Sequence, residues 1–415
     1  MSKRFNLISL GCPRNLVDSE LVISRLVKKG FIFSNLESSR IVLVNTCAFI
    51  DQAKKESIEA ILDLVELKKN KKIDKLIVFG CLVQRYKQEL VHSLKGVDAF
   101  LGTLSIDDGH VLRGCFLMPF HYRYVKICEG CNNNCSYCAI PGIKGSLKSR
   151  SINSILREVN FLDRKDLKEL ILVGQDTTSY GKDLKKGVSL SKLLSELTSK
   201  LKNISWIRLL YLHPEHINDN LIAQIADNPR ICKYIDLPIQ HINDKILQKM
   251  NRRKSRHEIE KLIVKLRKKI KNVVIRTSLI VGFPTETERE FNELFEFVGS
   301  MKFERLGVFT YSQEEGTSAY SMKNQVESGI KKDRFRRIMQ LQQSISKENN
   351  KKLINKKIKV LIDEIEDSLF IGRTQYDAPD IDGNVFIKTD KKLCVGDFID
   401  CKIIDSYEYD LLGAC

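Results

Sequence analysis

The sequence predicts a multidomain α/β protein, and three observations lead to that prediction. Strand-like and helix-like segments alternate over the first 115 residues, which predicts a parallel sheet covered by helices. The alternation continues through the central part with six strand candidates, which are too few to close an eight-stranded barrel. The last part changes to short alternating segments separated by Asp and Gly turns, which predicts a small antiparallel β-barrel.

Three cysteines of the N-terminal part stand just beyond the carboxyl ends of predicted strands. The expected elements are strands at 5–10, 41–46 and 75–80, separated by helices at roughly 16–29, 52–68 and 83–94. Cys12, Cys47 and Cys81 follow these strands, so the parallel topology is expected to bring the three thiols together. One cysteine at a strand end is commonly just a small buried residue, but three in register favour an iron–sulfur cluster. Polar residues beside them could orient the loops or cap helices, and capping is the favoured interpretation for each: Asn15, Asp18, Asn45 and Thr46.

A second cysteine group lies in one loop as C-x-x-x-C-x-x-C, formed by Cys131, Cys135 and Cys138. A disulfide framework would require an oxidising compartment, which nothing in the sequence indicates. A structural zinc site needs four ligands, and Cys128 could supply the fourth, although the loop between the two pairs would be short. Three thiolates can hold a 4Fe–4S cluster and leave one iron open, and this is the favoured interpretation.

Composition limits the class of protein. The chain has 415 residues and 43% hydrophobic content, which favours two or three domains with sizeable cores. No apolar run approaches the length of a membrane span, and the N-terminus leads directly into a strand, so neither membrane insertion nor export is expected. We therefore expect a cytoplasmic protein with reduced cysteines. The net charge of +17 indicates an anionic or RNA-rich partner, or merely a lysine-rich proteome.

The loop motif, with Tyr137 directly before its last cysteine, resembles the radical S-adenosylmethionine (SAM) enzymes. The resemblance implies that SAM binds the open iron of the cluster and that one electron cleaves it to a 5′-deoxyadenosyl radical, which abstracts an unactivated hydrogen. It also implies that the central domain is an open, partial TIM-like (βα)6 barrel. The active site would then lie at the carboxyl ends of the strands.

Within that superfamily, the segments 10–20, 45–50 and 79–81 resemble the N-terminal domain of the methylthiotransferases. In that family the cysteines corresponding to Cys12, Cys47 and Cys81 hold an auxiliary 4Fe–4S cluster. Pro13 is similar to the RimO branch, which adds a methylthio group to the β-carbon of an aspartate of small-subunit ribosomal protein S12. The MiaB branch, which modifies tRNA adenosine, usually has glutamine at this position. A MiaB-type enzyme and a non-catalytic RNA-binding iron–sulfur protein are the two alternatives.

The resemblance also implies residues that contact SAM. Gly174-Gln175-Asp176 follows the second central strand, where the superfamily binds the SAM amino group. Arg208 lies within the third predicted strand, where a buried guanidinium needs an anion such as the cofactor carboxylate. Ser278 and Gly282 are expected to contact the adenosine part of SAM. Tyr137 is expected either to contact the adenine through its backbone or to shield the cluster from solvent with its ring. Catalytic side chains beyond these are not assigned.

The C-terminal part resembles a TRAM domain, an OB-like barrel of five strands. Four of its strands are expected at 358–365, 369–374, 384–387 and 398–406. The acidic segment 372–383 would suit a basic protein substrate better than a phosphate backbone. Two basic clusters, 252–271 and 331–359, are expected to be solvated helix faces or contacts with ribosomal RNA, and a helix is expected over 333–349. The other cysteines are expected to be ordinary thiols: Cys115, Cys232, Cys394, Cys401 and Cys415.

The predicted organisation is a methylthiotransferase domain over 1–115, a radical SAM domain over 116–348 and a TRAM domain over 349–415. Expected cofactors are two 4Fe–4S clusters and SAM. Expected partners are ribosomal protein S12, a reductant such as flavodoxin or ferredoxin, and ribosomal RNA as a further contact. The expected oligomeric state is a monomer.

Overall fold

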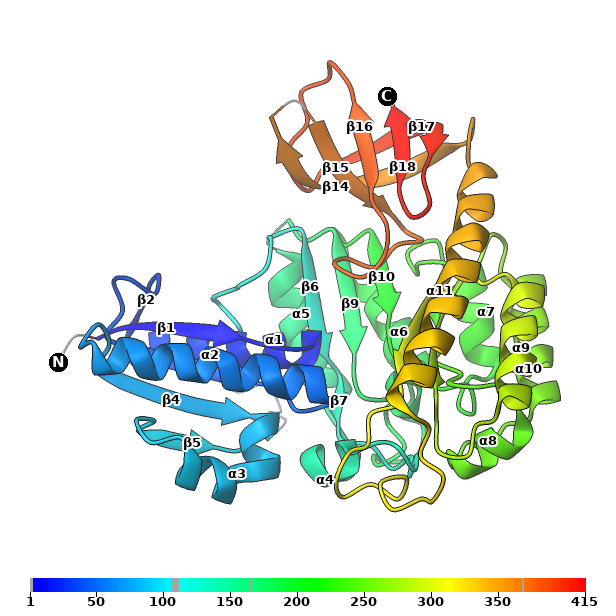
Figure 1. Ribbon diagram of the computed structural model, residues 1–415. Coiled ribbons are helices and arrows are strands. Elements are labelled where there is room, and N and C mark those ends of the chain that lie inside the picture. Colours follow the sequence, from blue (N-terminus) through cyan, green and yellow to red (C-terminus); the bar gives the residue numbers. More distant parts are fainter. Residues whose placement is uncertain (1–2, 106–111, 165, 368) are drawn as a thin grey trace.

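The computed structural model describes residues 3–105, 112–164, 166–367 and 369–415. It has three parts: an N-terminal sheet domain, a central partial barrel beside it, and a small C-terminal barrel above the central one (Figure 1). Within the described residues, no helix is both long and apolar enough to cross a membrane. The predicted fold class is therefore confirmed, and the contacts between the three parts determine where the functional groups lie.

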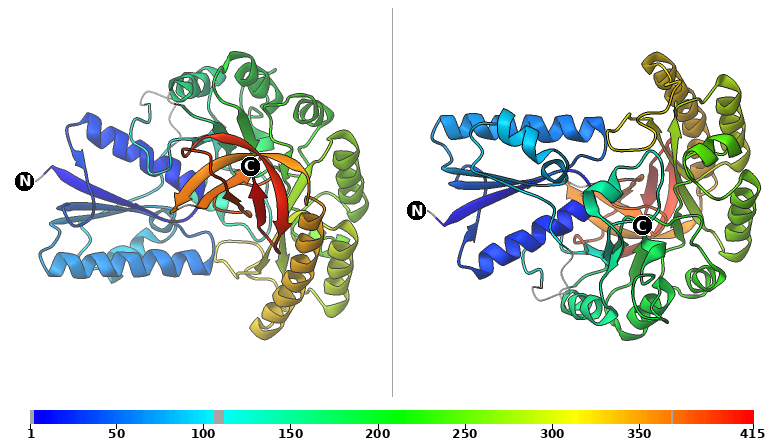
Figure 2. Two further views of the ribbon diagram at one scale, coloured as in Figure 1. Left: turned by 90° about the horizontal axis from the view of Figure 1, so that it is seen from above. Right: turned by 90° about the horizontal axis from the view of Figure 1, so that it is seen from below.

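The N-terminal domain is a parallel sheet of five strands in the order β2-β1-β3-β4-β5. Its strands are β1 (Arg4–Ser9), β2 (Ile32–Phe33), β3 (Ile41–Thr46), β4 (Lys75–Gly80) and β5 (Ala99–Leu101). One face is covered by α1 (Pro13–Lys28), and the other by α2 (Asp51–Lys69) and α3 (Cys81–Ser93) (Figure 2). The central strand β3 is an unbroken apolar run up to Val44, as expected for a strand that is buried on both faces.

The central domain places six parallel strands side by side. They are β6 (Tyr122–Lys126), β9 (Glu169–Val173), β10 (Trp206–Leu209), β11 (Tyr234–Asp236), β12 (Val274–Val281) and β13 (Arg305–Thr310). Hydrogen bonds form two three-stranded sheets, and the bridge Ile207–Ile231 connects them between β10 and β11. The outer helices are α5 (Ile152–Asp163), α6 (Leu190–Lys200), α7 (Asp219–Asp227), α9 (Arg256–Lys269), α10 (Glu288–Met301) and α11 (Ser328–Lys351). The short elements at the strand ends are β7 (Cys128–Glu129), β8 (Lys148–Ser149), α4 (Ile140–Lys144) and α8 (Asp244–Lys249).

The C-terminal part is a closed barrel in the order β14-β15-β16-β18-β17. Its strands are β14 (Lys357–Glu366), β15 (Leu369–Thr374), β16 (Val385–Lys388), β17 (Phe398–Ser406) and β18 (Leu411–Ala414). One prediction about this part is wrong: Cys401 and Cys415 are not free thiols but form a disulfide, with a Cα–Cα distance of 4.7 Å. Antiparallel pairing of Lys402 with Ala414 places the two cysteines opposite each other, and this register cannot be read from sequence spacing.

The C-terminal barrel packs on the amino-terminal ends of the central strands, away from the strand ends that carry the cysteine loops (Figure 1). The acidic segment forms this contact. Asp377 pairs with Arg305 at 2.5 Å, and Asp382 accepts a hydrogen bond from the Tyr234 hydroxyl at 2.6 Å. The third acid, Asp380, accepts from the hydroxyl of Tyr122 at 3.3 Å. The expectation that these carboxylates meet a basic partner is therefore corrected, because the central domain already engages them.

Arg208 belongs to the same contact. Its guanidinium is fully buried and pairs with Glu169 at 2.6 Å. It also donates to the carbonyl oxygen of Gln375 in the C-terminal barrel at 2.9 Å. The anionic partner that burial demands is thus a glutamate of the neighbouring strand. The geometry does not support Arg208 as a ligand of the SAM carboxylate.

Replacing Asp377 with alanine would leave Arg305 without its carboxylate in a nearly dry interface. Breaking such a pair typically costs about 3–5 kcal/mol, so a clearly lower melting temperature is expected in thermal denaturation. Asp400→Ala is the matched control, because Asp400 pairs with Lys357 at 3.7 Å on the exposed surface. Equal melting temperatures of the two variants would contradict the interface role of Asp377.

Candidate active site between two cysteine triads

The first group, here called the auxiliary triad, comprises Cys12, Cys47 and Cys81. Cys12 directly precedes α1, Cys47 follows β3, and Cys81 is the first residue of α3 after β4. Gly11 has φ +86°, and a Cβ on it would lie 2.6 Å from the Cβ of Cys47. The loop that carries Cys12 therefore lies directly against Cys47. The three cysteine loops meet at one edge of the sheet, as the parallel topology predicted.

Two asparagines hold these loops together. The Asn15 amide nitrogen donates to the carbonyl oxygens of Leu10 and Thr46, both at 3.1 Å. The Asn45 amide donates to the carbonyl oxygen of Asn15 at 2.8 Å and to the Ser19 hydroxyl at 3.0 Å. Neither α1 nor α2 has a side-chain cap, so the expectation that these residues cap helices is wrong. Their function in the structure is to tie the Cys12 loop to the ends of neighbouring strands.

The thiols of the auxiliary triad differ in acidity. Burial raises the pKa of Cys47 and raises that of Cys81 to about 12. Burial also opposes ionisation of Cys12, but the charge of Arg14 and its hydrogen bond outweigh this and lower the Cys12 pKa. The Arg14 Nε donates to Cys12 Sγ at 3.4 Å. A metal ligand must be a thiolate, so Arg14 prepares one of the three sulfurs for ligation.

The second group, here called the loop triad, comprises Cys131, Cys135 and Cys138 in the segment between β7 and α4. The Cys131 amide donates to the carbonyl oxygen of Gly145 at 3.1 Å. Ser136 anchors the middle of the loop, since its amide donates to the Met250 carbonyl at 3.0 Å and its hydroxyl to the Lys249 carbonyl at 2.6 Å. The loop is thus held from both sides at the carboxyl ends of the central strands.

Cys128 is separate from the loop triad. Its side chain is fully buried in the central core, and its Sγ donates to the carbonyl oxygen of Asp176 at 3.8 Å. A Cβ on Gly174 would lie 2.5 Å from this sulfur, so the two residues pack directly against each other. Burial raises the pKa of Cys128 well above its usual range. The geometry therefore assigns Cys128 to packing and leaves the loop with three thiols for a metal centre.

Both triads fit a cluster better than a single metal ion. Tetrahedral zinc with Zn–S bonds of about 2.3 Å holds its sulfurs only about 3.8 Å apart. In neither triad do all three sulfurs lie within 4.8 Å of one another. A cubane 4Fe–4S cluster accepts thiolates on separate irons and so suits more widely spaced sulfurs. The number and spacing of the donors are therefore consistent with the predicted 4Fe–4S clusters.

Unlike the two triads, a different group of described residues does bring three possible ligands within 4.8 Å of one another: Asp176, His213 and His216. The Asp176 carboxylate already accepts hydrogen bonds from Asn133 and His216, both at 2.7 Å. The Arg252 guanidinium lies 2.5 Å from His213 Nε2, and it also contacts Cys135 Sγ at 3.9 Å. A fixed cation at this position disfavours a metal ion, so we read the group as a hydrogen-bond network that links Asp176 to the cysteine loop.

The expected SAM contacts lie in different surroundings. The Oε1 of Gln175 is buried and has no hydrogen-bond partner among the described residues, so a donor from a bound molecule would satisfy it. Burial opposes ionisation of Asp176, but the hydrogen bond from His216 and the neighbouring histidines hold its pKa well below the usual range. Asp176 is therefore an anion beside the loop triad, as binding of a SAM amino group would require. Gln175 and Asp176 therefore remain the strongest candidates for contacts with SAM.

The three residues expected near the adenosine differ in their contacts. Tyr137 packs against an apolar cluster that includes Met250 and Phe283. Ser278 Oγ accepts a hydrogen bond from Arg276 at 3.4 Å, and its carbonyl oxygen accepts from the amide of Gln240 at 2.9 Å. Gly282 donates its amide to Glu286 at 3.0 Å, and a Cβ on it would lie 2.3 Å from Lys331 of α11. The structure thus shows that Gly282 permits the close approach of α11, and a ribose contact is not needed to explain it.

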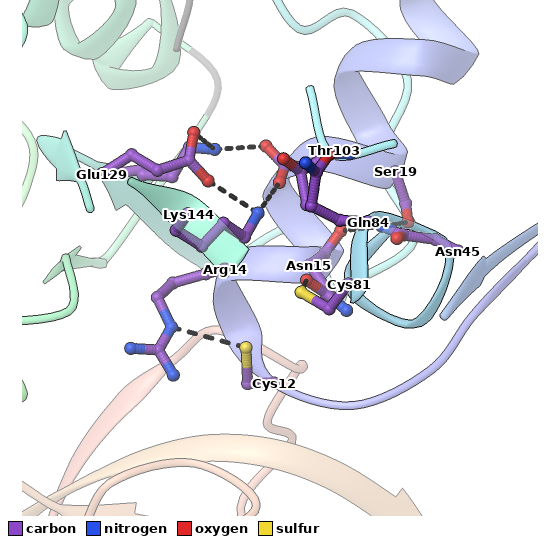
Figure 3. Close-up of polar contacts among 12 residues, drawn as sticks. Cys12, Arg14, Asn15, Ser19, Asn45, Cys81, Gln84, Thr103, Glu129 and Lys144 are labelled. Atoms are coloured by element: carbon purple, nitrogen blue, oxygen red, sulfur yellow. Dashed lines mark hydrogen bonds and ion pairs between the residues drawn. The ribbon is translucent and has the colours of Figure 1, made fainter. Parts of the chain in front are cut away.

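Four buried charges connect the two triads. Asp18 of α1 pairs with Lys126 and, at 3.4 Å, with Lys144. Glu129 pairs with the same lysines, at 3.3 Å and 2.7 Å (Figure 3). We call Asp18, Lys126, Glu129 and Lys144 the docking quartet; each side chain is no more than 6% exposed. Sequence reasoning missed this role, because Asp18 lies in one domain whereas Lys126, Glu129 and Lys144 lie in another.

The opposite edge of the partial barrel has its own contact with the N-terminal domain. Glu314, in the loop after β13, pairs with Arg85 at 2.7 Å and with Lys54 at 3.0 Å. The docking quartet lies at the β6 edge, so the N-terminal domain bridges both edges of the open barrel. The auxiliary triad is consequently fixed opposite the loop triad.

Comparison with known proteins gives a consistent result. The radical SAM superfamily model matches residues 125–298, the uncharacterized protein family UPF0004 matches 4–102, and the TRAM domain matches 354–415. A protein of Thermoanaerobacter sp. (strain X514) named ribosomal protein uS12 methylthiotransferase RimO is 43% identical, covering 99% of both chains. A protein of the same name from Clostridium novyi (strain NT) is 45% identical, covering 99% of this chain and 97% of its own.

A solved structure shows the same fold at low identity. It is the radical SAM methyltransferase TsrM from Kitasatospora setae with tryptophan and a SAM analogue bound. It aligns with a TM-score of 0.55 and 13% identity, covering 74% of this chain and 73% of the other. About three quarters of the fold described above is therefore shared with a solved radical SAM enzyme.

Asp18→Ala would leave Lys126 and Lys144 facing one carboxylate across the domain interface. Because an unpaired buried charge typically costs about 3–5 kcal/mol, we expect weaker docking of α1 on β6. Hydrogen–deuterium exchange should rise at both elements. Glu66→Ala is the control, since Glu66 forms an exposed pair with Lys69 on α2. Unchanged exchange at α1 and β6 would show that the quartet does not hold the domains together.

Proposed function

The chain belongs to the RimO family of radical SAM methylthiotransferases, and from this we propose that it adds a methylthio group to the β-carbon of an aspartate of ribosomal protein uS12. The observation that carries the proposal is the facing pair of cysteine triads. Arg14 reaches from the auxiliary triad to the loop that carries Gln175 and Asp176, since it contacts Cys12 Sγ at 3.4 Å and donates to the Gly174 carbonyl at 3.2 Å. A methylthio transfer requires a sulfur site beside a radical site, and this arrangement provides one of each.

We assign the six cysteines to two 4Fe–4S clusters. Cys131, Cys135 and Cys138 would hold the cluster that binds SAM, with Gln175 and Asp176 beside the amino group. Cys12, Cys47 and Cys81 would hold the auxiliary cluster at which the sulfur is presented. When bound, these cofactors supply the hydrogen-abstracting radical and the methylthio group. The protein's own contribution is to orient both sites and to keep the space between them dry.

The alternatives are less well supported. A tRNA adenosine methylthiotransferase of the MiaB type would use the same two triads, and a TRAM domain suggests RNA contact. The relatives at 43–45% identity over nearly the whole chain are, however, named as enzymes for a ribosomal protein. A non-catalytic RNA-binding protein would not need a buried anion and an unsatisfied amide oxygen beside the cysteine loop.

The basic clusters give limited support for contact with ribosomal RNA. Two of their arginines serve the interior instead: Arg252 contacts Cys135, and Arg334 pairs with Glu286 at 2.8 Å. Other members remain at the surface, such as Arg253 with its side chain 84% exposed. We propose that these exposed residues guide the enzyme to the ribosome, with a strong dependence on salt. A flavodoxin or ferredoxin as reductant, a monomeric state and a cytoplasmic location complete the proposal.

Two cysteine variants separate the roles of the triads. Cys135→Ala should abolish formation of 5′-deoxyadenosine under reducing, anaerobic conditions, because the SAM cluster loses a ligand. Cys12→Ala should retain that cleavage and lose the methylthiolated product. Both quantities can be followed by liquid chromatography and mass spectrometry. Full product from the Cys12 variant would refute the assignment of the auxiliary cluster.

The substrate itself is tested in cells with and without the gene. The intact mass of uS12 should decrease by one methylthio group when the gene is absent, while methylthiolated tRNA nucleosides remain. Loss of the tRNA nucleoside instead would establish the MiaB-type reaction. If neither changes, the proposed function is refuted.

A further inference from the structure

Arg14 differs from most buried arginines of the described chain, because its contacts include no carboxylate. Those with acidic partners are Arg113, Arg150, Arg208, Arg334 and Arg373. The contacts of Arg14 are the Cys12 sulfur, the Gly174 carbonyl and the ring of Tyr211, whose centroid lies 4.6 Å from the guanidinium carbon. A guanidinium remains charged at any physiological pH. This one therefore carries a positive charge that no carboxylate of the described residues contacts.

The guanidinium reaches from the auxiliary triad to the central domain. Arg14 follows the auxiliary triad residue Cys12 by two positions, yet it reaches the strand-end loop that precedes Gln175. Its side chain is only partly buried, so an incoming group can reach it. Nε and Nη1 are engaged, whereas Nη2 has no hydrogen bond within the described residues. The open side of the planar group can therefore accept an acidic ligand between the two triads.

Tyr211 fixes the orientation of the guanidinium. Its φ of +61° is unusual for a bulky residue, and strained backbone of this kind is found mostly where a site requires it. Its amide donates to Asp236 Oδ2 at 2.8 Å, and its carbonyl oxygen accepts from the amide of Thr177 at 3.0 Å. Burial raises the Tyr211 pKa to about 12, so the ring stays neutral. The strained turn thus supplies a rigid aromatic surface beneath Arg14.

We infer that Arg14 binds the side-chain carboxylate of the aspartate that the enzyme modifies. This role rests on the proposed function, since it presumes an aspartate substrate. The carboxylate and the β-carbon of aspartate are joined by a single bond. An anchor beside Cys12 therefore places that carbon next to the sulfur site of the auxiliary triad. The SAM carboxylate offers the same chemistry, but Arg14 belongs to the sulfur-bearing domain, which favours the substrate.

The test is equilibrium binding of two uS12-derived peptides to the anaerobic holoenzyme, measured by fluorescence anisotropy. One peptide contains the modified aspartate and the other has asparagine in its place. Arg14→Gln should lower the affinity for the aspartate peptide roughly thirtyfold or more, as expected when one partner of a desolvated charge pair is removed. The affinity for the asparagine peptide should change by less than about threefold, because the asparagine side chain carries no charge. Arg14→Lys should restore part of the difference.

Two further measurements discriminate between roles. The affinity for SAM is measured in Arg14→Gln beside peptide binding, because loss of a contact with the cofactor carboxylate would lower it. Arg289→Gln is the control for net charge, since Arg289 is 83% exposed on α10. Equal weakening of both peptides would overturn the proposal. Loss of SAM affinity with unchanged peptide binding would assign Arg14 to the cofactor carboxylate and also overturn it. A wild-type enzyme that leaves uS12 unmodified would instead refute the proposed function, and this role with it.

Discussion

The arrangement depends on one buried electrostatic contact, the docking quartet between α1 and the first edge of the partial barrel. Asp18 and Glu129 each face both Lys126 and Lys144, so each lysine has two carboxylates in a nearly dry interface. Removing ions from water is expensive, and such a network contributes little net stability compared with apolar packing. The network instead determines how the two domains are oriented, because its charges of opposite sign fit together in one relative placement of the domains. That placement fixes the distance between the two cysteine triads.

The quartet also lies close to both triads along the chain. Asp18 follows Cys12 on the first turns of α1, and Lys144 closes the short helix after Cys138. A displacement of either triad would therefore strain the same four charges. The second contact, from Glu314 to Arg85 and Lys54, prevents rotation about the first. An open barrel with two anchored edges keeps a rigid geometry without the two missing strands.

Local patterns in the sequence were sufficient to predict the strands and to group the cysteines. The strand Ile41–Thr46 has the predicted bounds, because an unbroken apolar run between polar segments has few alternatives. Cys12, Cys47 and Cys81 could be placed together because the parallel topology alone brings strand ends to one edge. The helix α11 extends further at both ends than the predicted 333–349. Gly329 in its first turn disfavours a helix, and its polar last turn has no apolar repeat.

Contacts between distant residues could not be predicted in this way. Arg208 required an anion, but composition could not show that Glu169 of the neighbouring strand supplies it. The acidic segment was correctly identified as acidic, yet its partners Arg305 and Tyr234 are known only once the C-terminal barrel is docked. The pairing of Cys401 with Cys415 depends on the register of two strands, to which sequence spacing gives no guide. The position of Arg14 between the triads likewise depends on how two domains meet.

The position of the C-terminal barrel determines how far a partner must extend to contact both this barrel and the cysteine triads. It seals the amino-terminal ends of the central strands, whereas the cysteine triads lie at the carboxyl ends (Figure 1). The strand β12 has eight residues, which at the usual rise corresponds to roughly 26 Å between the two ends. A peptide that extends only a few residues beyond the triads is therefore too short to touch the C-terminal barrel as well, since an extended chain advances about 3.3 Å per residue. A partner that engages both at once must extend from the triads along the barrel to its opposite end.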